Sequence, residues 1–146
     1  MILIEIINDY REKHEINSEY IKLLYKEILY QEKINVYDIS LILTNRNYLN
    51  KLKRKYLKKD HYTDVIAFNL NDKDEDIIGE IYVSIDDIKY NSIKFKNTFY
   101  KEFKRIIIHG LLHIIGYKDK TDSEKKKMTN LEDKYMLLTD EKIVNQ

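Results

Sequence analysis

The sequence predicts an α+β fold: a single compact domain of mixed α/β structure over residues 1–146, with a small mixed sheet and flanking helices. Short runs rich in β-branched residues alternate with longer segments in which apolar residues recur every three or four positions. No linker, repeat or low-complexity tract divides this pattern. The 146 residues, 43% of them hydrophobic, suffice for one core of ordinary size.

Each expected element has a local signal. Strands are expected at the β-branched runs 2–7, 34–43, 65–70 and 77–84. The last two flank an acidic turn, which favours a hairpin; its acids are Asp72, Asp74, Glu75 and Asp76. A helix at 18–31 carries its apolar residues on one face and has Ser18 as its expected N-cap. Further helices are expected at 45–57, which is basic, and at 86–92, 98–115 and 122–138.

Composition excludes several classes of protein. Without cysteine the chain has no disulfide framework and no thiolate metal ligands. Its apolar start is short and carries Glu5 where a signal peptide would be basic. No apolar run approaches the ~20 residues of a membrane span. We therefore expect a soluble, cytoplasmic protein without a membrane partner; the sequence does not indicate its oligomeric state.

The most informative segment is HGLLHIIGYKD, from His109 to Asp119. Histidines four residues apart lie on one face of a helix, so His109 and His113 can reach the same cation. Gly116 can end the helix in a left-handed turn, from which Asp119 returns as a third ligand. Two imidazoles and one carboxylate leave a coordination position for water, which is typical of catalytic zinc. We therefore expect one Zn²⁺ per chain.

An ordinary structural role for the two histidines is the alternative, because a lone histidine in an apolar helix is usually a satisfied core or surface residue. Here nearly all neighbours are large aliphatic residues, and two unpartnered imidazoles would be costly to bury. The spacing is also that of the zinc-peptidase motif H-E-x-x-H. Gly110, however, stands where the peptidases have their general base. The pattern keeps the metal ligands and argues against peptide hydrolysis by that route.

Residues 109–117, HGLLHIIGY, resemble the signature H-G-x-L-H-L-x-G-Y of the YbeY family of bacterial endoribonucleases. Leu49 and Asn50 open a basic helix that ends in Tyr56, as in that family. Residues 59–68, KDHYTDVIAF, resemble its segment K-D-x-x-T-D-V-L-S-F, and residues 78–84, IGEIYVS, resemble its strand G-D-I-x-I-S. Together these stretches cover about the central half of the chain.

The resemblance implies a compact α/β domain similar to a stripped-down zinc peptidase, with the metal ligands on a helix. It also implies metal-dependent cleavage of single-stranded RNA, in the maturation of ribosomal RNA ends and in ribosome quality control. The implied partners are single-stranded ribosomal RNA and the ribosome or its small subunit.

The chain departs from the family pattern at three positions. Asp119 stands where the family most often has a third His ligand. A carboxylate can also coordinate the metal, with altered affinity or metal preference. Leu57 replaces an Arg thought to face the substrate, and Ala67 replaces a Ser, so no role of those two side chains carries over.

A basic run between Lys51 and Lys59 contains no acid. We expect some of its cations to contact RNA phosphates, which supply affinity without reading sequence; the candidates are Lys53, Arg54, Lys58 and Lys59. A second basic stretch runs from Lys89 to Arg105. The alternative is a solvated charged face in a chain that is rich in lysine throughout.

The proton acceptor must come from elsewhere because position 110 has no side chain. Asp60 and Asp64 lie in the stretch that resembles the family's substrate-facing loop and are the candidate catalytic carboxylates. A metal-bound hydroxide or the 2′-hydroxyl of the RNA could take part in place of such a carboxylate. The ordinary structural role of Asp64 would be to cap a turn. His61 is expected to be a solvated loop residue, and His14 carries no functional argument.

A helical projection puts Glu102 and Arg105 on the face of the two histidines. Glu102 could orient a metal-bound imidazole, but an i,i+3 ion pair between Glu102 and Arg105 is the favoured interpretation.

Two other classes of function stay open. A zinc peptidase or other hydrolase predicts metal-dependent turnover of a peptide or ester and leaves RNA intact. A ribosome-associated binding protein with a structural metal predicts RNA affinity that survives metal removal, and Leu57 gives this class some weight.

Overall fold

The computed structural model describes residues 2–10, 16–57, 64–70 and 76–138. A four-stranded mixed sheet with the order β1-β2-β4-β3 runs through this part of the chain. Strands β1 (Ile2–Asn8), β2 (Tyr37–Thr44) and β4 (Ile77–Ser84) are parallel. Strand β3 (Val65–Asn69) is the outer strand and pairs antiparallel with β4, which confirms the expected hairpin.

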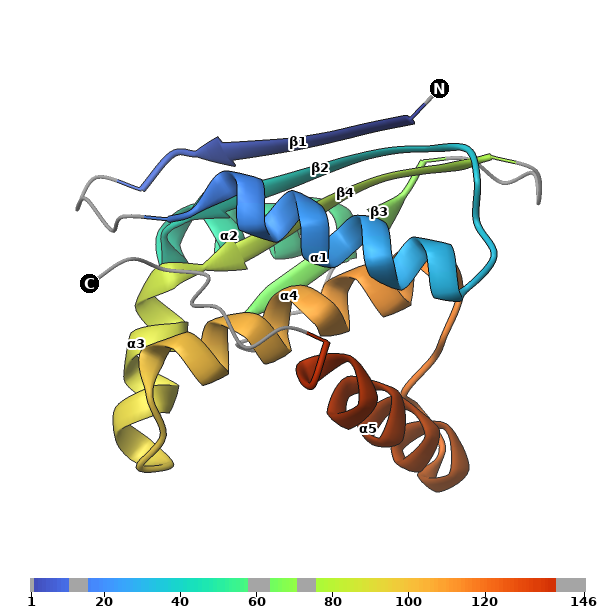
Figure 1. Ribbon diagram of the computed structural model, residues 1–146. Coiled ribbons are helices and arrows are strands. Elements are labelled where there is room, and N and C mark those ends of the chain that lie inside the picture. Colours follow the sequence, from blue (N-terminus) through green and yellow to red (C-terminus); the bar gives the residue numbers. More distant parts are fainter. Residues whose placement is uncertain (1, 11–15, 58–63, 71–75, 139–146) are drawn as a thin grey trace.

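The helices lie on both faces of the sheet. Helices α1 (Ser18–Gln31) and α4 (Phe99–Ile115) cover one face, whereas α2 (Arg46–Leu52) lies on the opposite face (Figure 1). Helix α3 (Ile85–Lys94) follows β4 directly, and α5 (Asp122–Met136) packs against α4. The expected α+β fold with a small mixed sheet is therefore confirmed.

The main core lies between the sheet and the pair α1 and α4. Its fully buried members are mostly aliphatic and include Ile21, Leu24, Ile39, Leu41, Ile81, Val83, Ile107 and Leu111. Two glycines let α4 approach the sheet closely. A Cβ atom at Gly110 would lie 2.6 Å from Ile81 Cγ2, and one at Gly79 would lie 2.6 Å from Ile114 Cδ1. Position 110 therefore faces β4, and a glutamate side chain would not fit there.

Three local features differ from the expectations. Asn17, not Ser18, is the N-cap of α1, since its side chain accepts a hydrogen bond from the N–H of Tyr20. The basic helix is α-helical only to Leu52 and continues as a π-helical turn, η1 (Lys53–Leu57). Helix α5 begins with a complete capping box between Thr121 and Glu124, which the sequence analysis did not anticipate.

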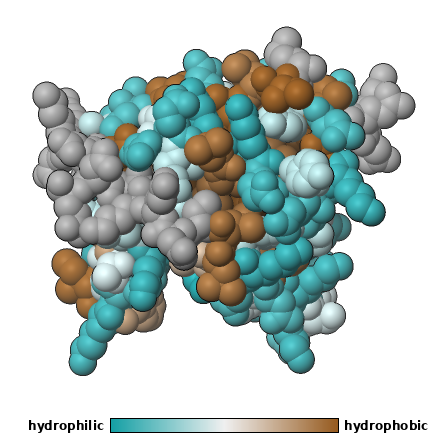
Figure 2. Space-filling model, in the orientation of Figure 1, coloured by the Kyte–Doolittle hydropathy of each residue, from teal (hydrophilic) through white to brown (hydrophobic). Residues whose placement is uncertain are grey.

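The surface in Figure 2 is largely hydrophilic. Apolar residues gather near the start of β1 and near the end of α3, where Ile2 and Ile93 are exposed. Among the described residues, none of the helices combines the length and apolar character that spanning a bilayer requires.

Candidate metal centre

Helix α4 presents two imidazoles on its partly exposed side. It begins at the N-cap Thr98, whose hydroxyl accepts from the N–H of Lys101, and runs without interruption through His109 and His113. It ends at Gly116, whose φ of 121° is unfavourable for residues with a side chain. The N–H of Tyr117 then returns to the carbonyl of Leu112 at 3.0 Å. The expected glycine stop is confirmed.

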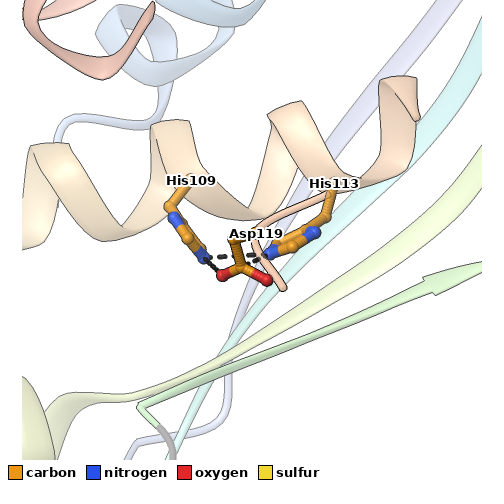
Figure 3. A group of neighbouring side chains, drawn as sticks. All are labelled: His109, His113 and Asp119. Atoms are coloured by element: carbon orange, nitrogen blue, oxygen red, sulfur yellow. Dashed lines mark hydrogen bonds and ion pairs between the residues drawn. The ribbon is translucent and has the colours of Figure 1, made fainter. Parts of the chain in front are cut away.

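The chain that leaves this turn brings Asp119 back to the two histidines (Figure 3). The Nε2 atoms of His109 and His113 lie 2.9 Å apart, and each lies 3.4 Å from Asp119 Oδ2. Ligand atoms placed about 2 Å from a tetrahedral zinc ion are about 3.3 Å apart. All three residues are half-buried. Three donors with this spacing could hold a metal ion such as zinc, and a set of three would leave one coordination position for water.

Glu132 of α5 orients His109 through a hydrogen bond. Its Oε2 lies 2.6 Å from His109 Nδ1, so it accepts the Nδ1 proton and leaves Nε2 free to bind metal. Arg105 donates to the other oxygen, Oε1, at 3.0 Å and to Asp133 Oδ1 at 2.8 Å. The Glu132 side chain is only 10% exposed, which shields its own contacts with His109 and Arg105 from water.

Glu132 was not found from the sequence. It lies 23 residues after His109, and only the packing of α5 against α4 brings the two together. A weak signal existed, because Glu132 is an acid among the buried α5 residues Met128 and Tyr135.

The expected ion pair between Glu102 and Arg105 is wrong. Arg105 binds the two α5 carboxylates instead, and Glu102 accepts a hydrogen bond from Asn97 Nδ2 at 3.2 Å. The projection placed Arg105 on the correct face, but it could not reveal that another helix covers that face. The imidazole is therefore oriented by Glu132 and not by Glu102.

Electrostatics around the two imidazoles suit a divalent cation. Burial lowers the pKa of His109, but the hydrogen bond and charge of Glu132 and the charges of Asp119 and Asp64 outweigh it, so the pKa is raised. The pKa of His113 is lowered by burial and by the neighbouring His109, against the opposing charge of Asp119. Negative charge thus surrounds His109 on several sides.

The loop that carries Asp119 is fixed at Tyr117. The hydroxyl of Tyr117 donates to Glu32 Oε1 at 2.5 Å, and the hydroxyl of Tyr135 donates to Glu32 Oε2. The hydrogen bond to Glu32 and partial burial raise the pKa of Tyr117 to about 12, so the phenol stays protonated and continues to donate. The end of α1, the metal loop and α5 thus meet at one carboxylate.

Asp64 lies just before β3 and close enough to the centre to interact electrostatically with His109. Its carboxylate accepts from Asn91 Nδ2 at 3.3 Å, and its carbonyl accepts from the N–H of Ser84. Burial raises its pKa, although its own backbone N–H and His109 act in the opposite direction. A carboxyl group with a raised pKa is suited to proton transfer.

The other predicted residues are distributed differently. Lys53 is buried, at 3% exposure, so its predicted contact with RNA phosphate is wrong for this conformation. Arg54 is exposed. Asp60, Lys58, Lys59, His61 and His14 lie outside the described residues.

The fold and the centre together define a class: small α+β proteins in which two histidines of one helix and a residue from the following loop, here Asp119, could hold a metal ion. Residues 6–139 match the family described as Endoribonuclease YbeY. The chain therefore belongs to the YbeY family.

Individual relatives agree with this assignment. The chain is similar to the Endoribonuclease YbeY of Karelsulcia muelleri (strain GWSS), with 42% identity over 141 residues, or 95% of this chain and 99% of the relative. The one from Flavobacterium psychrophilum is 39% identical over 132 residues, 89% of this chain and 93% of the relative. A protein from Thermotoga maritima with a known solution structure matches with a TM-score of 0.62 and 29% identity, over 91% of this chain and 86% of that chain.

Proposed function

We propose that this chain, as one domain over residues 1–146, is a metal-dependent endoribonuclease that cleaves single-stranded RNA. The observation that carries the proposal is the group of three metal-binding side chains on and after α4, in a chain of the YbeY family. By the resemblance, its place is in the maturation of ribosomal RNA ends and in ribosome quality control, with the ribosome or its small subunit as partner. Such work belongs in the cytoplasm.

Zinc is the proposed cofactor, at one ion per chain. His109, His113 and Asp119 would hold it, since their donor atoms have the spacing that tetrahedral zinc requires. When bound there, zinc would supply Lewis-acid polarisation and a lowered pKa of water. The protein's own part is to keep His109 in one tautomer through Glu132 and to leave one side of the group open to substrate.

Asp64 is the proposed proton acceptor. Position 110, where the peptidases carry their base, faces β4 and is filled by Ile81 and Val65. Asp64 is a half-buried carboxylate whose pKa is raised by burial and whose charge acts on His109, so it can take a proton from water or from a 2′-hydroxyl. Asp60 stays a second candidate on the sequence argument alone.

RNA phosphates are proposed to contact Arg54, together with Lys58 and Lys59 of the same basic run. Arg54 is exposed on η1, and contacts of this kind position a strand without reading its sequence.

The two alternatives have less support. Peptidase activity would need a base that position 110 has no room for. A purely structural zinc is usually enclosed by four protein ligands, whereas this group offers three half-buried ones.

The test is an incubation of purified, metal-loaded protein with single-stranded RNA, double-stranded RNA and a peptide mixture, each with and without chelator. We expect cleavage of the single strand only, lost on chelation. Metal-dependent turnover of the peptides, or RNA binding without cleavage at full metal loading, would each contradict the proposal in favour of one alternative. The variant Lys126→Ala, at an exposed position of α5, is the control and should cleave normally.

A further inference from the structure

Four aromatic side chains form a continuous row on the sheet face opposite α4. The ring centroids of Tyr48 and Tyr82 lie 6.3 Å apart, those of Tyr82 and Phe68 5.9 Å, and those of Phe68 and Tyr56 5.6 Å. The rings come from α2, β4, β3 and η1, respectively. We call these four residues the ring row.

The alternation of side chains along β3 puts the ring row on that face. Val65 would contact a Cβ at Gly110, and Asn69 donates to the carbonyl of Ile114, so both point toward α4. Phe68 lies next to Asn69 and therefore points the opposite way. Tyr82 likewise follows Ile81, which packs against Gly110.

Exposure separates the ring row from an ordinary core. Leu49 is fully buried and anchors α2 on the sheet, so Tyr48 beside it is not needed for packing and is 46% exposed. Tyr56 at the other end is 57% exposed, and the two middle rings are half-buried. The planes of neighbouring rings meet at 33°, 80° and 75°, so the rings do not stack in parallel on one another. Parallel stacking on a ring face is therefore available to a ligand.

Cations surround the exposed end of the row. Lys55 Nζ lies 5.2 Å from the centroid of the Tyr56 ring, and Lys51 and Arg54 are exposed on the same stretch of helix. One acid, Glu80, also lies at the row and accepts a hydrogen bond from the Tyr82 hydroxyl at 3.4 Å. Proteins that bind unpaired nucleic acid combine aromatic rings, on which the bases stack, with cations that contact the backbone.

The outer strand β3 joins the row to the metal centre. Val65, the first residue of β3, faces Gly110, which follows His109, on one side of the sheet, and Phe68 belongs to the row on the other. β3 has a sheet neighbour only in β4 among the described residues, so a strand of RNA that crosses its outer edge can reach both sites.

We propose that Tyr48, Tyr82, Phe68 and Tyr56 form a base-stacking platform for the single-stranded RNA substrate, on the far side of β3 from the metal centre. This inference rests on the proposed function for its ligand. It also gives a reason for single-strand preference, because bases within a duplex are not free to stack on protein rings.

The test measures RNA affinity and cleavage separately. A fluorescent oligouridine and an abasic strand of equal length and charge are titrated against Tyr56→Ala and Tyr48→Ala in the His113→Ala background, which prevents cleavage during the measurement. Tyr90→Ala is the matched control, because Tyr90 is 58% exposed with Lys94 Nζ 6.0 Å from its ring, but lies on α3 away from the row.

We expect each ring-row variant to lose about tenfold in affinity for oligouridine and nothing for the abasic strand. Tyr56→Phe should bind normally, as should Tyr90→Ala. Ring-row variants that match Tyr90→Ala, or that weaken both strands equally, would overturn the platform. Ultraviolet crosslinking of oligouridine to the unaltered chain covers the case of a misfolded variant. Crosslinks at any of the four rings support the platform, and crosslinks confined to residues outside the ring row overturn it.

Cleavage by the metal-loaded chain distinguishes this inference from the proposed function. If cleavage is sensitive to chelator but the ring-row variants keep their RNA affinity, the platform is wrong and the proposed nuclease activity is supported. If binding depends on the bases but no cleavage occurs, the platform is supported and the proposed nuclease activity is wrong.

Discussion

At the scale of single residues, the centre depends on which nitrogen of His109 faces the metal. Glu132 takes the Nδ1 proton at 2.6 Å, and Arg105 holds the other oxygen of that carboxylate at 3.0 Å. The imidazole therefore has one tautomer and one orientation before any metal arrives. Mutation of a partner of this kind typically lowers metal affinity or activity by about 10- to 100-fold.

Replacing Glu132 by glutamine tests this role. The amide keeps the shape but loses the charge and part of the accepting capacity, so zinc affinity should fall about 10- to 100-fold. Competition with a chromophoric chelator measures it. Asp133→Asn is the matched control, since Asp133 also binds Arg105 but its side chain is 59% exposed and does not touch His109. Equal affinities in the two variants would contradict the account.

Spacing along one helix and one turn predicted His109, His113 and Asp119 because these contacts are local in sequence. Glu132 could not be predicted in the same way, since a tertiary contact between two helices places it. The burial of Lys53 could not be predicted for a related reason. Charge patterning shows where the cations lie in the sequence, but it does not show that the helix changes from α to π at that residue.

At the scale of elements, the packing of α4 on the sheet sets the position of the metal ligands. Gly110 lies between them in sequence and faces Ile81 and Val65 of the sheet. Periodicity predicted both elements and the hairpin, because these patterns repeat over many residues. Periodicity did not predict how closely α4 approaches the sheet, because that distance depends on the absence of a Cβ atom at Gly110.

Gly110→Ala should destabilise the fold by about 1–3 kcal/mol, because the new methyl group would lie 2.6 Å from Ile81 Cγ2 and force a shift of the helix or strand. Urea denaturation monitored by circular dichroism measures the free energy of unfolding. Lys101→Ala, an exposed position on α4, should change stability by less than about 0.5 kcal/mol. Unchanged stability in Gly110→Ala would refute the close packing.

Asp86 links three parts of the fold through hydrogen bonds and makes the free energy of unfolding depend on pH. It accepts from the Tyr10 hydroxyl at 2.5 Å and from the N–H of Arg46 at 3.0 Å. Burial raises its pKa, but these hydrogen bonds and the charges of Arg46 and Lys89 outweigh it, so the pKa is lowered. A lowered folded-state pKa means that this stabilisation is present above the unfolded value of about 3.9 and is lost as the pH falls through the folded value.

Asp86→Asn should therefore lose about 1–2 kcal/mol of unfolding free energy at neutral pH. The difference from the unaltered chain should begin to shrink below about pH 4, where the carboxylate of the unfolded chain becomes protonated. It should vanish only once the pH has fallen below the lowered folded-state pKa of Asp86. Urea denaturation across this pH range measures both curves. Asp9→Asn, at an exposed carboxylate, should show no such pH-dependent difference. A constant gap at all pH values for Asp86→Asn would argue against the ionic role.

At the scale of the whole molecule, residues from distant parts of the chain converge on one centre. Glu32 at the end of α1 fixes the metal loop through Tyr117, and Glu132 of α5 fixes His109. The β3 strand runs beside the centre and leads to the ring row on the opposite face. A metal that binds the folded chain should consequently stabilise all of these elements together.

The most direct test is the rate of single-stranded RNA cleavage as zinc is added to metal-stripped protein. If His109, His113 and Asp119 hold a catalytic zinc ion, the rate rises in proportion to zinc up to one equivalent per chain and then stays level, with no such rise in His113→Ala. A cleavage rate that is independent of added zinc, or that is the same in His113→Ala, would contradict this prediction.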